Sequence, residues 1–479
     1  MKVAPAFLAT VFLFHAAPLE GAEQIVTLGD SLTFAYEASF AFEKKILGTT
    51  YGDGFGPQVR NWVEILSSNT YRKNHFDLGA RDSISLLVGG SLYFRQKHNW
   101  AIPGLKVDQL RRFVSGDATV TDLLAEDPDF ASLSLALSFS DFNENTDFNV
   151  TDLEAQIANT AERLTFFIGG NDINGVYGTI YNGGSPGTFV DDFIADSAFI
   201  LDWVLDINPG IQIVVVNVPH VGITPDVKAS YPTHATKTPL VTNVLADLNA
   251  RLAGLAAERG LGYADIFTPT LPLLGTAPFC IQGLPFTNSG STTGDLNYVW
   301  LNGPVSANFH PNTNAQAVIA NTIVDAFNRH YGTGIAPLTA TEILGGLLGK
   351  SATAIDMTYT TWISNYGLPA ASSDADSDGD GIANGVEFAL GLDPTFHDSW
   401  KVSTRIVNGS GGKELELAYP VRLTSTSRFT LRPAAAVGSL DTFVPFTVPP
   451  APGVDGVARA RISASGPRAF LRLQADIAN

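Results

Sequence analysis

Unbroken runs of apolar and β-branched residues alternate with stretches of helical periodicity through the first 335 residues of the chain. The clearest run is I211-Q-I-V-V-V-N-V218, and such continuous apolar positions are typical of a strand buried on both faces. Similar runs occupy residues 24–28, 164–168, 261–266 and, more briefly, 100–102, and helical patterns lie at 151–164, 190–207, 242–259 and 314–330. Strands that alternate with helices predict a parallel sheet with helices on both faces, and such sheets bind ligands at the carboxyl ends of their strands.

The composition narrows the classes of function. Of 479 residues, 45% are hydrophobic and 16% are charged, which predicts about two to four folded domains rather than a disordered chain. The net charge of −18 argues against nucleic acid and anionic membrane surfaces as partners, and it favours cation binding. The single cysteine, Cys280, cannot form an internal disulfide, and we expect it to serve packing.

The N-terminus has the pattern of a secretory signal peptide. Lys2 precedes an apolar run at residues 3–14, and small residues follow at 16–22. This run is too short to span a bilayer, and no other stretch reaches 18 apolar residues. We therefore expect a signal peptide at 1–22, no transmembrane anchor, and bacterial export to the periplasm, the cell surface or the medium. A buried first helix is the alternative interpretation.

Ser31 marks the point at which a predicted strand breaks. The stretch I25-V-T-L-G-D-S-L-T33 runs from apolar residues into Gly-Asp-Ser, and the following residues predict the start of a helix. A serine between a strand and a helix exposes its hydroxyl, and the N–H groups of the helix N-terminus point toward a bound group. Such a serine attacks an acyl carbon when a base accepts its proton. The alternative role is that of a helix N-cap, which is frequent for serine.

Four segments in sequence resemble the motifs of the GDSL/SGNH hydrolase superfamily of esterases and lipases. They are G29-D-S-L32, N99-W-A-I-P-G104, G169-G-N-D172 and F309-H-P-N312. Their order and spacing agree with the family over about residues 23–332, and the four together are far more specific than any one of them. The resemblance implies an α/β fold with three α/β/α layers around a flavodoxin-like parallel sheet.

The resemblance also implies a role for each matched residue. Ser31 would be the nucleophile, and His310 would act first as general base and then as general acid, since imidazole titrates near neutral pH. The backbone N–H groups of Ser31 and Gly104 and the side-chain amide of Asn171 would form the oxyanion hole. These roles imply a serine-dependent carboxylic ester hydrolase with no cofactor for catalysis. Its expected partner is a small-molecule or polysaccharide ester, since the family's substrates range from acetylated polysaccharides and short acyl esters to lipid esters.

One position departs from the family pattern. The family has an Asp three residues before the histidine, and this chain has Ala307 there. Three alternatives follow. A backbone carbonyl, such as that of Ala307, orients His310 in a Ser–His dyad, or an inserted loop has displaced the acid and Asn302 or Asp295 serves instead. The third alternative is an impaired enzyme, and the chain would then be a surface binding protein that retains the hydrolase scaffold.

An acidic run follows the predicted hydrolase domain. D376-S-D-G-D-G-I-A-N-G-V-E387 fits the pattern D-x-D-x-D-G-x5-E, whose spacing wraps about six to eight oxygen ligands around one Ca²⁺. The expected ligands are the side chains of Asp376, Asp378, Asp380, Asn384 and Glu387 and the carbonyl of Ile382. The stretch resembles a dockerin-type or thrombospondin type 3 calcium loop. Because the chain has one such loop, we expect a structural ion rather than cohesin binding, and a solvated acidic linker is the alternative.

The C-terminal part has the pattern of an all-β domain. Segments such as K413-E-L-E-L-A-Y419 alternate apolar and polar residues, as half-buried antiparallel strands do. The predicted divisions are a hydrolase domain at 23–335, a linker with short helices at 336–371, the calcium loop at 372–398 and a small β-sandwich at 399–479. The β-domain would contact glycan or the cell surface, and a calcium-dependent adhesion module that carries the hydrolase is a further alternative.

Overall fold

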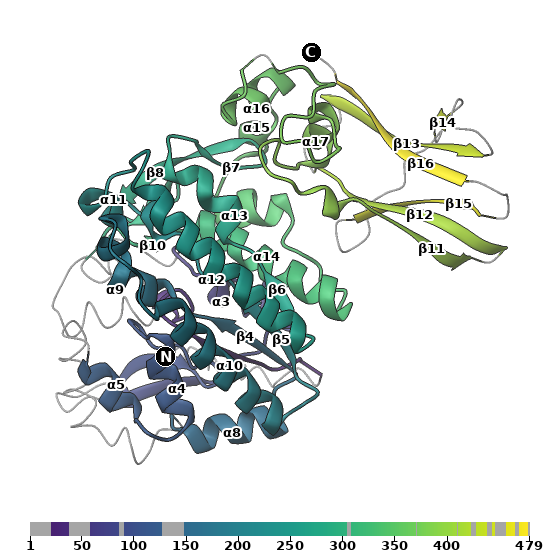
Figure 1. Cartoon of the computed structure of the whole chain (residues 1–479). Helices are drawn as coiled ribbons and strands as arrows, with labels where there is room; N and C mark the ends of the chain where they lie inside the picture. Colours follow the sequence, from purple (N-terminus) through teal and green to yellow (C-terminus); the bar gives the residue numbers. More distant parts are fainter. Residues whose placement is uncertain are drawn as a thin grey trace, which may run out of the picture.

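The computed structural model has two connected regions (Figure 1). An α/β body runs to the end of α14, and a smaller region with two groups of β-strands follows it. The described residues are 21–37, 58–85, 91–126, 148–303, 308–369, 371–409, 411–422, 428–437, 443–445, 457–464 and 469–477. The predicted signal peptide up to residue 20 and the predicted partner Ala307 lie outside them.

A four-stranded parallel sheet forms the centre of the α/β body. Its strands, in spatial order, are β1 (Ile25–Gly29), β4 (Arg163–Phe167), β5 (Gln212–Val216) and β6 (Gly262–Ala264). All of the pairings between these neighbours are parallel. Each strand coincides with one of the predicted apolar runs, so the predicted parallel sheet is confirmed.

A short extended segment continues the sheet beyond β1. Thr27 of β1 forms a parallel bridge with Asn99. The Thr27 N–H donates to the carbonyl of His98 at 3.0 Å, and the Trp100 N–H donates back to the carbonyl of Thr27 at 2.9 Å. The Ile102 N–H then donates to the carbonyl of Gly29 at 3.1 Å. The predicted short run therefore pairs with β1 on the edge opposite β4, which gives the sheet a flavodoxin-like order.

Helices cover both faces of this sheet. One layer consists of α4 (Val107–Val114), α8 (Val150–Asn159), α9 (Gly170–Tyr181), α10 (Phe189–Ile207) and α12 (Thr238–Glu258), and the other of α3 (Trp62–Leu66) and α14 (Thr313–Tyr331). Strand residues alternate between the two layers: Leu28 and Phe166 belong to the core under the first layer, and Val214 belongs to the core under the second. Burial on both faces explains the continuous apolar runs, and the three-layer α/β/α class is confirmed.

The remaining helical elements are short. They are α5 (Val120–Glu126), η1 (Val221–Ile223), α11 (Pro225–Ser230), α13 (Phe267–Thr270), η2 (Leu271–Leu274), the π-helix η3 (Thr341–Leu347), α15 (Ala352–Ile355), α16 (Tyr359–Asn365), α17 (Asn384–Leu390) and η4 (Ser399–Lys401). Within the described part of the chain, no helix combines the length and the apolar character that crossing a membrane requires.

A second sheet, which the sequence did not predict, lies between β6 and α14 in the chain. Its strands are β7 (Phe279–Ile281), β8 (Leu284–Ser291), β9 (Tyr298–Leu301) and β10 (His310–Pro311), in the spatial order β10-β9-β8-β7. A separate antiparallel hairpin consists of β2 (Arg81–Ser85) and β3 (Ser91–Gln96). The second sheet matters for the site because its shortest strand, β10, contains His310.

The C-terminal region contains two three-stranded sheets. One has the order β11 (Ser403–Gly409), β12 (Gly412–Pro420), β15 (Val457–Ser463), and the other has the order β14 (Val444–Pro445), β13 (Phe429–Val437), β16 (Ala469–Ile477). One hydrophobic core joins these strands to the two preceding helices: Trp362 of α16 and Phe388 of α17 pack with Leu417 and Phe429. The predicted linker, the acidic loop and the β-strands therefore share a core.

The turn between β7 and β8 joins this C-terminal core to the α/β body. The Gly283 N–H donates to the hydroxyl of Tyr366 at 3.1 Å, and Nδ2 of Asn365 donates to the carbonyl of Gly283 at 2.8 Å. A Cβ atom at residue 283 would lie 2.1 Å from Cδ1 of Trp362, so only glycine fits there. The backbone of the body thus lies directly against α16.

Leu164→Ala should lower the free energy of unfolding of the α/β body by about 2–5 kcal/mol. Leu164 is fully buried in β4, and truncation leaves a cavity between the sheet and its helices. Leu240 of α12 is 40% exposed, so Leu240→Ala is the matched control, with an expected change within about 0.5 kcal/mol. Urea unfolding followed by tryptophan fluorescence measures both, and equal losses would contradict the described core.

Candidate functional site

Ser31 lies in a tight turn at the carboxyl end of β1. The N–H groups of Thr33 and Phe34 both donate to the carbonyl of Asp30 at 3.0 Å, which closes a single helical turn around Ser31 where the sequence predicted the start of a helix. Ser31 is partly exposed, whereas Leu32 is buried. The turn therefore presents Ser31 at the edge of the sheet where parallel α/β folds bind ligands.

Asp30 connects the first motif segment to the third. Its carboxylate is 1% exposed, accepts the Leu32 N–H at 2.9 Å, and also accepts a hydrogen bond from the backbone of Gly170. Burial raises the pKa of Asp30 to about 7, and these backbone donors oppose the rise. A buried carboxylate so bonded orders the two turns that follow β1 and β4.

Gly104 lies in the turn that follows the extended segment beside β1. Its φ of 77° is in the left-handed region that favours glycine. Asn99, at the start of this segment, accepts the hydroxyl hydrogen of Thr27 at 2.8 Å and donates through Nδ2 to the carbonyl of Thr33 at 3.0 Å. The side chain of Asn99 therefore fixes the second motif segment against the turn that contains Ser31.

Asn171 and Asp172 join the third segment to the second. Nδ2 of Asn171, in the first turn of α9, donates to the carbonyl of Leu105 at 3.1 Å. Oδ1 of Asp172 accepts the Val107 N–H at 3.0 Å, at the start of α4. Burial raises the pKa of Asp172 to about 7. The structure thus brings Asn171 next to the turn that contains Gly104.

His310 lies in the second sheet, where it pairs with Leu301 of β9. Tyr36, in the segment that contains Ser31, donates its hydroxyl hydrogen to the carbonyl of Pro311 at 2.7 Å. The rings of Tyr36 and His310 meet edge to face, with centroids 6.4 Å apart, and Nε2 of Gln316 donates to the Tyr36 hydroxyl at 2.8 Å. Tyr36 therefore links the Ser31 segment to the strand of His310, a role that no local sequence pattern indicates.

The three predicted partners of His310 stay predictions. Ala307 lies outside the described residues. The Asp295 carboxylate accepts the backbone N–H and the side-chain amide of Asn297 at 2.9 and 2.7 Å, and the Asn302 N–H donates to the carbonyl of Ser291 at 2.9 Å.

Asn312 supports the His310 strand, and sequence reasoning gave it no role. Its Nδ2 donates to the carbonyls of Asp295 and Tyr298 at 2.9 and 3.1 Å, and its Oδ1 accepts the Thr313 N–H at the start of α14. Its place directly after His-Pro in the fourth motif was the available signal. Asn312 thereby joins the strand to both β9 and α14.

Two cavities flank the motif segments. The first, of about 220 Å³, is mostly apolar and is lined by the neighbours of Ser31 and His310, namely Leu32, Phe309 and Pro311, rather than by those two residues. The second, of about 200 Å³, is lined by Ile102, Pro103, Gly104, Leu105, Lys106, Gln109, Leu123 and Glu126. The predicted oxyanion-hole glycine thus borders a cavity with charged and amide side chains in its wall.

His220 belongs to the wall of the apolar cavity and is fully buried. Its Nδ1 accepts the Gly222 N–H at 3.1 Å, and its Nε2 lies 3.1 Å from the hydroxyl of Thr242. Burial lowers the pKa of His220 to about 4, so the ring is neutral at physiological pH. This histidine orders the turn after β5.

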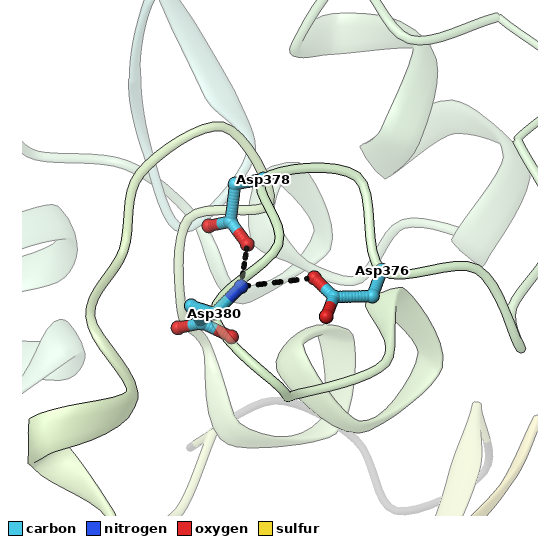
Figure 2. Close-up of side chains that lie close together, drawn as sticks. All are labelled: Asp376, Asp378 and Asp380. Carbon is cyan, nitrogen blue, oxygen red and sulfur yellow. Dashed lines mark hydrogen bonds between the residues drawn. The ribbon is translucent and has the colours of Figure 1, made fainter.

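The acidic loop brings three of its predicted ligands together (Figure 2). The carboxylate of Asp376 accepts N–H groups of Gly379, Asp380 and Gly381 at 2.8, 3.2 and 2.9 Å. Oδ1 of Asp378 accepts the Asp380 N–H at 3.1 Å. Carboxylate oxygens of Asp376, Asp378 and Asp380 lie within 4.8 Å of one another, which is a spacing that one cation can bridge.

Glu387 is the strongest indication that this loop fits a cation. Its side chain is fully buried, and neither carboxylate oxygen has a hydrogen-bond partner. Burial and repulsion from Asp378, Asp398 and Asp380 raise the pKa of Glu387 to about 9. A buried carboxylate without a donor is unfavourable unless a cation balances its charge, and the oxygen-rich donor set suits a hard divalent ion.

The other two predicted ligands are ordered by the loop itself. Asn384 accepts the Ser377 N–H at 3.2 Å and donates to the hydroxyl of Ser377 at 2.9 Å. The Ile382 N–H donates to Oδ1 of Asp380 at 2.8 Å. Whether the side chain of Asn384 and the carbonyl of Ile382 bind an ion stays a prediction.

Comparisons with known proteins give distant structural likeness. No family model matches the chain, and no curated protein matches it. Among solved structures, an extracellular lipase from Streptomyces rimosus is similar at 16% identity and a TM-score of 0.32, over 64% of this chain and all of that chain. A variant acetyl xylan esterase from Geobacillus stearothermophilus is similar at 16% identity and a TM-score of 0.31, over 65% of this chain and 95% of that chain.

A phospholipase A1 from Streptomyces albidoflavus is similar at 13% identity and a TM-score of 0.30, over 65% of this chain and 99% of that chain. At these TM-scores the likeness supports neither mechanism nor substrate. The fold class comes instead from the strand order and the helical layers of this chain.

Asp30→Asn should flatten the pH dependence of stability. Between pH 3.8, the ordinary pKa, and about 7, the folded state holds a proton on Asp30 that the unfolded state has released. The stability due to this group is therefore full below that range and is lost as the pH rises through about 7. The wild type should lose up to about 4 kcal/mol more than Asp30→Asn, since one pKa unit corresponds to about 1.4 kcal/mol.

Urea unfolding at pH 4.5 and pH 7.5 measures this difference. Other buried carboxylates, such as Glu64 and Asp172, also have raised pKa values. The slope of stability against pH should therefore be smaller in Asp30→Asn than in the wild type, but not zero. Asp247 is exposed on α12, and Asp247→Asn should leave the slope as in the wild type. Identical slopes in Asp30→Asn and the wild type would show that the Asp30 carboxylate does not titrate in this range.

Proposed function

We propose that this chain belongs to the GDSL/SGNH superfamily and is an exported, serine-dependent carboxylic ester hydrolase. The observation that carries the proposal is the set of hydrogen bonds between its motif segments at one edge of the sheet. Asp30 bonds the first segment to the third, Asn171 of the third bonds to Leu105 directly after the second, and Tyr36, just after the first, bonds to Pro311 of the last. These segments supply a hydroxyl, an imidazole and N–H donors, the groups that acyl transfer requires.

In the proposed first step, Oγ of Ser31 attacks the ester carbonyl carbon while His310 accepts the hydroxyl proton. The backbone N–H groups of Ser31 and Gly104 and the amide of Asn171 stabilise the resulting oxyanion, at roughly 3 kcal/mol per donor. The carbon–oxygen bond to the alcohol then breaks, and the alcohol leaves with the proton from His310. Water next gives a proton to His310 and attacks the acyl group, which releases the acid and returns the proton to Ser31.

The side-chain amide of Asn171 suits a role in the oxyanion hole. An amide NH₂ group has two hydrogens, and the carbonyl of Leu105 accepts one of them at 3.1 Å. That bond fixes the amide plane beside the turn of Gly104, and the second hydrogen is then available to the substrate. Fixed donors of this kind need no reorganisation as charge develops.

The proposed mechanism needs a group that orients the ring of His310. We propose a Ser–His dyad in which a backbone carbonyl, such as that of Ala307, holds the ring, with Asn302 or Asp295 as the alternatives. A neutral partner fixes the tautomer but stabilises the imidazolium less than a carboxylate does. The rate should therefore fall below that of a complete triad.

The proposed substrate is an ester of a small acyl group, including acetyl esters of polysaccharides. A polar cavity beside Gly104, with Lys106, Gln109 and Glu126 in its wall, is suited to a polar part of such an ester. The apolar cavity near Leu32 and Phe309 is suited to an apolar acyl or alcohol group. Catalysis would need no cofactor, export would use the N-terminal signal peptide, and the β-strand region would contact glycan or the cell surface.

We also propose that the acidic loop binds Ca²⁺ in a structural role. The ligands would be the carboxylates of Asp376, Asp378, Asp380 and Glu387, the carbonyl of Ile382 and, at the ninth position of the loop, Asn384. The buried Glu387 carboxylate without hydrogen-bond partners supports this assignment. The ion would balance carboxylates that otherwise repel one another beside the C-terminal core.

Ser31→Ala should lower kcat for p-nitrophenyl acetate by about 10⁴-fold or more, because the nucleophile is lost. His310→Ala should have a similar effect, and Asn171→Ala should lower kcat by about 10²–10³-fold through loss of one oxyanion donor. The exposed Ser185 in the loop after α9 gives a control, and Ser185→Ala should keep full activity. If wild type and Ser31→Ala hydrolysed the ester equally slowly, the surface binding protein would replace the enzyme proposal.

Glu387→Gln should change stability only when calcium is present. Without metal at pH 7 it should melt near the wild-type temperature, since the raised pKa of about 9 already keeps the Glu387 side chain neutral. In millimolar Ca²⁺ the wild type should gain several degrees, whereas Glu387→Gln should gain little. Scanning calorimetry with calcium and with EGTA measures both, and Glu258→Gln, at an exposed glutamate, is the matched control. Equal calcium responses in the wild type and Glu387→Gln would refute the loop assignment.

A further inference from the structure

The cluster of carboxylates extends beyond the acidic loop to Asp398. Asp398 is 1% exposed, and its Oδ1 has no hydrogen-bond partner. Ligand atoms of Asp380, Glu387 and Asp398 lie within 4.8 Å of one another. Glu387 contributes two further buried oxygens without partners to this group. Asp398 lies after α17 and outside the spacing of the loop motif, so the sequence pattern did not include it.

This group differs from the one that the loop forms. The loop group contains Asp376, Asp378 and Asp380; the buried group shares Asp380 with it and also includes Glu387, the last residue of the loop motif. Together the two groups hold five carboxylates, and the paired cation nearby is Lys401, whose Nζ lies 3.0 Å from Oδ2 of Asp398. Asp376 of the loop group is exposed to solvent, whereas Glu387 and Asp398 of the buried group are not. Buried carboxylates without a counterion are strongly destabilising, and one divalent ion together with Lys401 would balance the three of the buried group, so this group favours an ion of its own.

The buried group holds the turn η4 in place. Oδ2 of Asp380 accepts the N–H groups of Asp398 and Ser399 at 3.1 and 2.7 Å. One carboxylate oxygen of Asp398 then belongs to the buried group with Asp380 and Glu387, and the other lies against Nζ of Lys401. An ion bound in this group would therefore fix both ends of the short turn from Ser399 to Lys401.

The same turn contacts α14 of the α/β body. The guanidinium of Arg329 lies 4.6 Å from the ring centroid of Trp400. Asp325, one helical turn earlier on α14, also interacts with this turn. Burial raises the pKa of Asp325 to about 6, and the positive charge of Lys401 opposes this rise. Because α14 begins directly after the strand of His310, the turn connects the carboxylate group to a helix of the predicted hydrolase domain.

We propose that a second divalent cation binds between Asp380, Glu387 and Asp398 and latches the turn Ser399–Lys401 onto α14, so that metal binding in the C-terminal region stabilises the hydrolase domain. The site takes a hard divalent cation, and Ca²⁺ is the probe. The inference does not depend on hydrolase activity, since it concerns binding and stability alone.

Calcium titration of the metal-stripped full chain tests the second position. Isothermal titration calorimetry should give two Ca²⁺ per chain for the wild type and one for Asp398→Asn. Asp374 is exposed beside the loop, and Asp374→Asn should keep two. A single Ca²⁺ in the wild type, or equal stoichiometry and affinity in the wild type and Asp398→Asn, would overturn the proposal.

Hydrogen–deuterium exchange in α14 tests the latch. Adding Ca²⁺ to the wild type should slow exchange of the amides at 325–331 by about tenfold, and Asp398→Asn should show little slowing. Trp400→Ala keeps every carboxylate and Lys401, and covers the case in which Asp398→Asn fails to fold. It removes the ring that lies against Arg329, so it should still bind two Ca²⁺ but lack the slowing in α14. Wild-type slowing in Trp400→Ala would refute the latch while leaving the second ion intact.

Discussion

The backbone hydrogen bonds on both edges of β1 are the constraint on which the rest of the structure depends. The extended segment that contains Asn99 pairs with one edge, and β4 pairs with the other. Parallel neighbours end at the same side of a sheet, so the turns after these three segments meet however far apart they lie in the sequence. Ser31, Gly104 and Asn171 each lie in or beside one of those turns.

The candidate base reaches this edge by a different route. His310 belongs to a strand of the second sheet, so the parallel ladder does not position it. Side-chain hydrogen bonds position it: Tyr36 donates to the carbonyl of Pro311, and Asn312 donates to the carbonyls of Asp295 and Tyr298, before and at the start of β9. The predicted site therefore depends on one backbone ladder and on a small number of buried polar side chains, whose bonds are strong because water is excluded.

The sequence predicted the parallel sheet well for a physical reason. Strands buried on both faces must be apolar at nearly every position, and such runs are unambiguous. The second sheet was missed because β7, β9 and β10 are only two to four residues long, and because β8 (Leu284–Ser291) is partly exposed and interrupted by Gly, Asn and Thr. Helix α9 was missed because it begins in the glycine-rich third motif, where helix propensity is low.

Residues that contact partners far away in the sequence could not be predicted either. Tyr36 and Asp398 have no characteristic spacing to the residues that they contact, and only the folded chain brings them together. The loop motif predicted five side chains, yet Asn384 also has a full set of bonds within the loop. A spacing pattern identifies which residues can approach an ion, and the local fold decides how each of them is used.

The close contact at Gly283 has a consequence for how the chain can vary. The ring of Trp362 lies where any side chain at residue 283 would begin, and Trp362 also belongs to the core under the C-terminal strands. The C-terminal region is thus packed against the α/β body and is not joined to it by a flexible linker alone. Swapping it for an unrelated module, by recombination or by engineering, would leave the β7–β8 turn facing solvent, so we expect the two regions to be inherited together.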